Sequence, residues 1–335
     1  MIHEALERFS RKLEKEGLSW RTLPGDKREA LADEALEEIT GDYGNTILHS
    51  SSRSAWQIQR IRRILRRTVW ALQEQIRRGS FDPEGAELAF SVNEGSAAVQ
   101  VALSEDERLI LKGRIDRLDV CREKDRLYLR IIDYKTGSTA MDLNLLLEGL
   151  QLQLAVYLKA ALELEQRKNP GIQTEPAGFY YYRGGDPLIP GRPGESQAER
   201  DLEILKELKL DGLSRWENEI LGLLDAELDA SGKSLVIPVS FKKDGGLSKY
   251  SRAAGMEDFL TIQKYTEKKI QEIGRAILSG RTEARPYRME KKTACDFCPY
   301  RGICGFDQRL PGFEYRRITK RTEEEILRKM REEAD

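Results

Sequence analysis

The chain has 335 residues, of which 39% are hydrophobic, and 56 basic against 57 acidic side chains give it a formal net charge of -1. This length predicts one large or two small domains with enough apolar content for a core. The near-neutral charge gives no global signal for nucleic-acid binding, so any such contact has to come from local patches. No apolar run is long enough to span a bilayer and the N-terminus shows no signal-peptide pattern. We therefore expect a cytoplasmic protein with no membrane partner.

The first 80 residues show helical spacing of apolar side chains over 1–16, 26–40 and 54–79. His3 stands at the start of the first of these helices, where a histidine is by default a partly exposed surface residue. The third helix is rich in arginine, at Arg60, Arg62, Arg63, Arg66, Arg67, Arg77 and Arg78. A solvated surface is the default for these arginines. Contact with a DNA backbone is the alternative, because phosphates are bound without regard to sequence.

Short apolar runs follow the arginine-rich helix. Residues 82–85 read as a turn, and 87–92 and 98–103 read as strands. Glu87 begins the first of these strands, in an E-x-x-F pattern with Phe90. From the residues alone this glutamate is equally well an ordinary acidic group on an edge strand.

The stretch 113–135 carries the clearest chemical signal. Its two apolar runs flank a charged turn at 122–126, which predicts a β-hairpin. A hairpin brings Asp116 and Asp133 side by side, with Lys135 on the same face as Asp133. Two carboxylates suit Mg²⁺, and a neighbouring lysine is able to hold a nucleophile or stabilise a transition state. The alternative is that these charged residues merely end a strand.

The second half of the chain predicts a long helix over 144–167, on which Gln153 and Tyr157 share one face. Gln151 is an alternative to Gln153, but its spacing takes it off that face. The remaining predicted elements are a strand at 176–182, a loop at 183–197, a charged helical region to about 229, a strand at 236–241 and a helix at 255–279.

Cys295, Cys298 and Cys304 form a C-x₂-C-x₅-C element. Three cysteines this close in a reducing compartment argue for a metal group, with free thiols as the alternative. A structural zinc site and a [4Fe–4S] cluster each need a fourth ligand. Cys121 is the remaining cysteine, but it lies on the predicted hairpin and is a poor candidate.

The order and spacing of Gly113–Arg117, Asp133–Gly137, Gln153 and Tyr157 resemble the RecB-type branch of the PD-(D/E)XK nucleases. The resemblance implies a restriction-endonuclease-like α/β fold, in which helices flank a mixed central sheet. It implies Mg²⁺ binding by Asp116, Asp133 and the Tyr134 carbonyl, with Lys135 as a catalytic residue. Gln153 and Tyr157 would line the active site.

His3 then matches the metal-binding histidine of a G-x-x-x-H motif. The glycine of that motif is missing, so we expect the sequence to begin inside the motif, with Met1 as an added start. Cys295, Cys298 and Cys304 match three ligands of a [4Fe–4S] cluster that staples the ends of the nuclease domain. The fourth ligand would lie before residue 1, so we expect the cluster to be incomplete or absent.

Further segments resemble the C-terminal nuclease domain of AddB, which belongs to the bacterial AddAB helicase–nucleases; they are Gly178–Tyr181, Lys209–Leu213, Phe241–Lys249 and Gly280–Asp307. This resemblance implies a Mg²⁺-dependent DNA exonuclease in double-strand break repair and homologous recombination, which cuts the 5′-ended strand. It also implies an AddA-type helicase–nuclease partner. No P-loop sequence is present, so we expect no ATP hydrolysis by this chain.

The expected domain is 1–318, with a catalytic core at about 1–182, an insertion and helical region at about 183–280, a cysteine region at about 281–310 and a charged tail at 319–335. Two alternatives remain. One is a stand-alone exonuclease of the CRISPR-associated RecB-like type, which the long region between residues 183 and 255 disfavours. The other is an idle DNA-binding module, which the intact Asp116, Asp133 and Lys135 disfavour.

Overall fold

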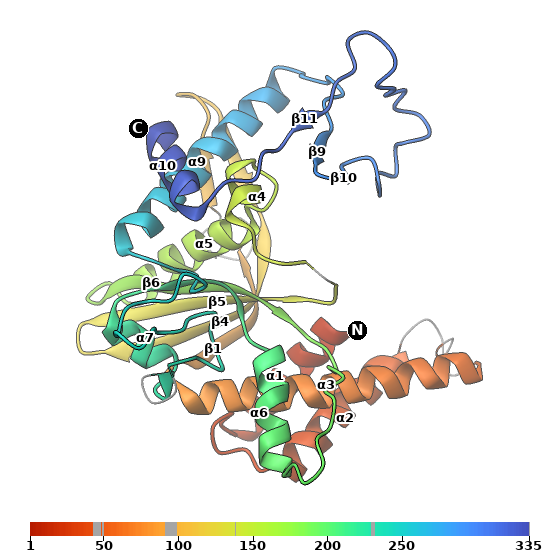
Figure 1. Cartoon of the computed structure of the whole chain (residues 1–335), viewed down its shortest axis with the longest axis vertical. Helices are drawn as coiled ribbons and strands as arrows, with labels where there is room; N and C mark the ends of the chain where they lie inside the picture. Colours follow the sequence, from red (N-terminus) through yellow and green to blue (C-terminus); the bar gives the residue numbers. More distant parts are fainter. Residues whose placement is uncertain (43–47, 49, 91–98, 138, 229–231, 335) are drawn as a thin grey trace. The chain divides into compact units, whose positions relative to one another are not determined.

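The computed structural model describes residues 1–335 except 43–47, 49, 91–98, 138, 229–231 and 335. The chain divides into two compact units (Figure 1). The first comprises residues 1–99, 112–141 and 153–259, and the second comprises 100–111, 142–152 and 260–335. Among the described residues, no helix is both long and apolar enough to cross a bilayer.

A six-stranded mixed sheet forms the centre of the first unit. The strand order is β1 (Asp82–Phe90), β4 (Gly113–Glu123), β5 (Arg126–Lys135), β6 (Gln173–Arg183), β7 (Asp211–Arg215) and β8 (Ala253–Ala254). Neighbours are antiparallel except β5 with β6 and β7 with β8. The predicted hairpin is therefore correct, and its turn is shorter than expected, because only Lys124 and Asp125 lie outside the two strands.

Helices cover both faces of this sheet. Figure 1 shows α3 and α6 on one side and α5 on the other. The helices of the first unit are α1 (Ile2–Glu16), α2 (Gly25–Asp42), α3 (Ser52–Arg78), α5 (Gln153–Lys168), α6 (Gln197–Glu207) and α7 (Asn218–Leu224). The α/β architecture with a mixed central sheet flanked by helices matches the expectation from sequence.

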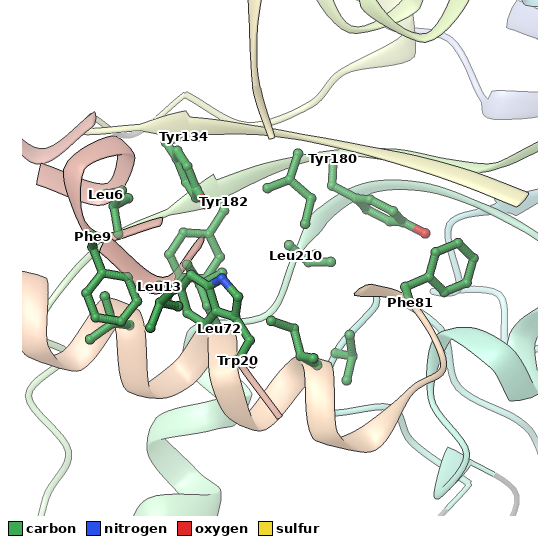
Figure 2. Packing of buried hydrophobic residues seen from close by; sticks show 14 of the residues in the cluster. Leu6, Phe9, Leu13, Trp20, Leu72, Phe81, Tyr134, Tyr180, Tyr182 and Leu210 are labelled. Atoms are coloured by element: carbon green, nitrogen blue, oxygen red, sulfur yellow. The ribbon is translucent and has the colours of Figure 1, made fainter. Parts of the chain in front are cut away.

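The core between α1, α3 and the sheet is dense in aromatic side chains. Figure 2 shows Phe9 of α1 and Leu72 of α3 in the cluster that also contains Tyr134 and Tyr182 from the sheet. Burial of each large apolar side chain contributes about 1.5–3 kcal/mol. This packing positions the first turn of α1, and with it His3, next to the strands that carry the acidic residues.

Asp119, Arg117 and Arg130 form a buried group of charged residues in the sheet itself. Asp119 is fully buried and lies 2.6 Å from Nε of Arg117 and 2.7 Å from Nε of Arg130. Both arginines are also at most 3% exposed. Their charges hold the pKa of the Asp119 carboxyl below its ordinary value in spite of the burial. This group therefore remains ionised at neutral pH and neutralises part of a buried positive charge.

The second unit contains helices and short strands. They are α4 (Leu143–Leu147), most of α9 (Met256–Leu278), α10 (Glu323–Ala334), most of the β2–β3 hairpin (Val99–Ala102 and Arg108–Leu111), and a sheet of β10 (Lys292–Thr293), β9 (Tyr287–Met289) and β11 (Arg316–Arg317). The expected charged tail contains α10, in which Ile326 and Met330 are buried.

Several local predictions were wrong. Residues 82–85 belong to β1, where a bulge between Pro83 and Gly85 accommodates the turn-like sequence. Residues 236–241 form only isolated bridges, because bends interrupt the run. The strand expected at 87–92 ends at Phe90 as far as the structure describes it; 91–98 lie outside the described residues.

The prediction of one helix over 144–167 is also wrong, because the structure has two helices there, α4 and α5. Gly149 ends α4 with a φ of 76°. Its N–H donates to Leu146 and the N–H of Leu150 donates to Leu145, which is the Schellman pattern. The apolar periodicity continues across this break and therefore conceals it.

Candidate active site

Asp116 and Asp133 meet on neighbouring strands. The β4–β5 register pairs Arg117 with Ile132, so Asp116 and Asp133 occupy the next position along the hairpin. Oδ2 of Asp116 accepts a 2.7 Å hydrogen bond from the backbone N–H of Tyr134. The structure therefore brings the two predicted carboxylates together at one end of the hairpin.

Lys135 is held in a chain of polar contacts. Its Nζ lies 2.5 Å from Oδ2 of Asp133 and donates to Oε1 of Gln153 at 2.9 Å. Nε2 of Gln153 donates in turn to the hydroxyl of Tyr157 at 3.0 Å. Lys135 also lies 4.9 Å from the ring centre of Tyr181, a contact that the sequence analysis missed. The ammonium group is thus fixed by three elements, β5, α5 and β6.

Close packing of aromatic rings supports Tyr157, the last residue in this series of polar contacts. The rings of Phe90 and Tyr157 meet edge to face with centroids 5.7 Å apart. A Cβ at Gly113 would lie 2.4 Å from the Phe90 ring and 3.1 Å from the Tyr157 ring. Glycine is required at 113 because the two rings occupy the space that a side chain would need.

His3 joins the acidic pair from a distant part of the sequence. Its Nδ1 lies 3.4 Å from Oδ2 of Asp116, and its side chain is 38% exposed. The hydrogen bond to Asp116 raises the pKa of His3 above its ordinary value, against the opposing effect of burial. The default interpretation of His3 as an ordinary surface histidine does not account for this contact.

Glu87 completes the group, although it was only a minor candidate from the sequence. Its neighbours Ala86 and Leu88 pair with Arg117 and Ile115, so it stands opposite Asp116. Its φ of 53° is rare for a residue other than glycine, and such strained backbone clusters at functional sites. The E-x-x-F pattern with Phe90 was the signal in the sequence.

One ligand atom each from His3, Glu87 and Asp116 lies within 4.8 Å of the other two. Burial, and then the charge of Asp116, raises the pKa of Glu87. Burial also raises the pKa of Asp133, an effect that Lys135 opposes and Asp116 reinforces. Crowded carboxylates of this kind repel one another, and a divalent cation relieves the repulsion.

Other predicted ligands are not gathered in the same way. Among the described residues, His3, Glu87 and Asp116 are the group whose potential ligand atoms lie close enough together to hold a metal ion. In the same described part of the chain, the thiols of Cys295, Cys298 and Cys304 do not meet at a common centre. The ring of Tyr134 is buried in the core. Ligation by its backbone carbonyl remains a prediction.

Comparison with known proteins decides the family. The model of a family described as the PD-(D/E)XK nuclease superfamily matches residues 1–305. The chain belongs to the PD-(D/E)XK nuclease superfamily. It is similar to three proteins that are each named as the B-type subunit of an ATP-dependent helicase/deoxyribonuclease. One is from Lachnoclostridium phytofermentans (38% identical, 99% of this chain and 28% of the relative), one from Thermoanaerobacter sp. strain X514 (35%, 100% and 29%), and one from Clostridium botulinum strain Hall (36%, 97% and 28%).

The expectation of a PD-(D/E)XK nuclease similar to the B-type subunits of helicase–nucleases is therefore confirmed. The chain spans 28–29% of the length of these relatives.

Proposed function

We propose that this chain is a metal-dependent nuclease that hydrolyses DNA phosphodiester bonds at the Asp116–Asp133 site. The observation that carries the proposal is the convergence of His3, Glu87 and Asp116 within ligand distance, beside the Asp133–Lys135 pair. Carboxylate and carbonyl oxygens are the ligands that a hard cation such as Mg²⁺ prefers. When bound there, Mg²⁺ would lower the pKa of a water and offset charge on the phosphate.

Each side chain has a distinct role in this proposal. His3, Glu87, Asp116 and Asp133 hold the cation, with the Tyr134 carbonyl as a further ligand. The positive charge of Lys135 orients the attacking water or stabilises the negative charge that builds on the phosphate.

Gln153 and Tyr157 hold Lys135 in the position that this task requires. Gln153 contacts the Lys135 ammonium group directly, at 2.9 Å. Tyr157 lies behind Gln153 and accepts its amide hydrogen at 3.0 Å. Both are positioning residues, because their contacts reach the reacting groups through Lys135.

We infer the wider context from the relatives. Their name describes the B-type subunit of an ATP-dependent helicase and deoxyribonuclease. This supports DNA as the substrate, an AddA-type helicase–nuclease as the partner, and a role in double-strand break repair. The domain limits expected from the sequence and the choice of the 5′-ended strand remain predictions.

The proposed [4Fe–4S] cluster rests on Cys295, Cys298 and Cys304. These three lie in one loop and are partly or fully exposed, whereas Cys121 is buried, which raises its pKa to about 11 and disfavours its thiolate. The described residues thus offer three thiolates of the four that a cluster takes. Anaerobic reconstitution with iron and sulfide tests the assignment. Iron uptake should fall in Cys298→Ser, and equal uptake by both proteins would contradict it.

The nuclease proposal is tested by degradation of end-labelled single-stranded DNA with Mg²⁺ or with EDTA. We expect Mg²⁺-dependent cutting by the chain. Removal of a residue that only supports a metal ligand lowers activity about 10–100-fold. Asp116→Ala removes a proposed ligand itself, so it should lower the rate of cutting more than about 100-fold. Asp125→Ala, in the exposed turn of the same hairpin, is the control and should cut normally. DNA binding without Mg²⁺-dependent cutting would favour an idle binding module.

A further inference from the structure

The outer surface of α3 carries basic and aromatic side chains at regular spacing. The α3 stripe consists of Arg53, Trp56, Arg60, Arg63, Arg67 and Trp70. Steps of three and four residues place all six on one face of the helix. The buried residues of α3, among them Ile58, Leu65 and Val69, lie on another face.

The arginines of α3 fall into two classes by their partners. Arg62 donates to Glu37 at 3.0 Å, and Arg66 binds both oxygens of Asp33, so these two are neutralised by α2. In the stripe, by contrast, no carboxylate lies at ion-pair distance from Arg60 among the described residues. Arg63 is 68% exposed and lies 3.7 Å from Asp186, and Arg67 lies 4.0 Å from Asp201. The N-terminal part of the stripe therefore presents positive charge at Arg60 that no carboxylate of the described residues neutralises.

Two tryptophans are interleaved with these arginines. Trp56 is 60% exposed, and the guanidinium of Arg60 lies 5.9 Å from its ring centre. The guanidinium of Arg67 lies 5.1 Å from the ring of Trp70. Trp70 is partly buried and packs against the cluster of Ala71, Ile204, Leu205 and Leu208, whereas Trp56 is exposed. An exposed indole lowers solubility without adding to a core, so the presence of Trp56 beside cations suggests a ligand that has both flat rings and negative charge.

A hollow of about 370 Å³ lies between α2 and the C-terminal half of the stripe. Its lining is Arg63, Arg66, Arg67 and Trp70 from α3, Arg28 and Glu29 from α2, and Asp186 and Asp201. The four arginines thus outnumber the three carboxylates, Glu29, Asp186 and Asp201. Arg28 is only 9% exposed and donates to the neutral oxygen of Gln73 at 2.6 Å. Its Nε has no hydrogen-bond partner, and it forms no ion pair with a carboxylate within the described part of the chain. A buried cation without an anionic partner is costly, and an anion bound in the hollow would offset that cost.

We propose that the α3 stripe and the adjoining hollow bind single-stranded DNA, with a backbone phosphate in the hollow and a base stacked on Trp56. The inference rests on the proposed function for the identity of the polymer. A duplex hides the faces of its bases, so an exposed indole favours a single strand. An acidic partner protein is the competing occupant, and its chemistry accounts for the arginines but gives no reason for the exposed Trp56 indole.

The proposal is tested by fluorescence anisotropy of a dye-labelled oligothymidylate titrated with the whole chain in EDTA, where the proposed Mg²⁺-dependent cutting does not occur. Arg60→Gln and Arg63→Gln should each weaken binding about fivefold and lower the slope of log affinity against log salt by about 0.7. Arg62→Gln is the matched control, since it removes the same charge one residue away from a side chain already paired with Glu37. It should change the affinity less than twofold.

The hollow and the indoles are tested separately. Arg28→Gln should weaken binding by a similar factor, while circular dichroism checks that the variant folds. Trp56→Ala should weaken binding about fivefold or more, and Trp56→Phe should restore most of it, because stacking needs an aromatic face. Equal losses in the stripe variants and Arg62→Gln would overturn the proposal.

A protein interface would give a different result. Stripe variants would then bind the oligonucleotide normally and lose association with the helicase partner, which would overturn the proposal. Failure of the proposed function is distinguishable from this: a chain that never cuts DNA, but whose stripe variants lose oligonucleotide affinity, contradicts only the nuclease assignment. A chain that cuts DNA and binds it equally well without the stripe contradicts only the inference.

Discussion

The backbone N–H of Tyr134 donates a 2.7 Å hydrogen bond to Oδ2 of Asp116. The same oxygen lies 3.4 Å from Nδ1 of His3. The carboxylate of β4 is therefore oriented by the backbone of β5 and by α1. This preorganisation reduces the ordering that a bound cation has to impose on its ligands.

The rate of cleavage at limiting Mg²⁺ should rise with pH. Metal ligands must lose their protons, and the pKa values of Glu87, Asp133 and His3 are all raised. Apparent Mg²⁺ affinity should therefore increase from the acid range through the pKa of His3, which is raised above its ordinary value of about 6.5, and then level off. Rates measured across pH at low and at saturating Mg²⁺ check this. In His3→Asn the step near neutral pH should vanish, and a step that survives would contradict ligation by His3.

Glu87→Gln should stabilise the fold while it weakens metal binding. The folded-state pKa of Glu87 is raised by burial, so the folded chain holds this proton more tightly than the unfolded chain does. That contribution is present below the unfolded pKa of about 4.3 and is lost as pH rises through the folded pKa. At pH 7 without divalent cations, we expect the melting temperature of Glu87→Gln to rise by about 2–4 °C, equivalent to roughly 1 kcal/mol. A lower melting temperature would show that the contact of Glu87 with Arg114 matters more than the burial of its charge.

Gln153→Leu should lower kcat by about 10–100-fold and leave KM nearly unchanged. Gln153 contacts Lys135 at 2.9 Å, so its loss affects the catalytic step through the position of the ammonium group. Gln151→Leu is the matched control, because Gln151 accepts from the backbone N–H of Asp142 instead. Steady-state kinetics on a short single-stranded substrate separate the two parameters. Equal losses in both variants would point to a structural effect on the start of α5.

Asp119→Ala should lower the free energy of unfolding by about 3–5 kcal/mol, since it leaves Arg117 and Arg130 buried without a counter-charge. Denaturant unfolding followed by circular dichroism measures the change. Asp125→Ala removes the same group from the exposed turn of the hairpin and should stay within about 0.5 kcal/mol of the parent chain. A small effect for Asp119→Ala would mean that water reaches the two arginines.

The β4–β5 hairpin could be predicted from the sequence because its signals are local. Alternating apolar residues and a charged turn specify two paired strands, and pairing alone brings Asp116 next to Asp133. Gln153 and Tyr157 were likewise predictable as neighbours, since they are four residues apart on one helix.

Local signals also misled. The apolar spacing over 144–167 is continuous, yet Gly149 adopts a positive φ and ends α4 there. Periodicity reports which face of a segment is buried, and it does not report where the backbone hydrogen bonds stop. The prediction of a strand at 236–241 was wrong for the same reason. Apolar residues of this run are buried, but the run forms only isolated bridges.

The sequence by itself determined the family motifs, the hairpin and the helical face that carries Gln153. Only the tertiary structure decided that potential ligand atoms of Glu87 and His3 lie within 4.8 Å of Asp116. It also decided that Arg62 is paired while Arg60 has no carboxylate at ion-pair distance among the described residues. These relations join residues of separate elements. They depend on how α1 packs on the sheet and α2 on α3, which is a sum of many small non-local contacts that no single stretch of sequence encodes.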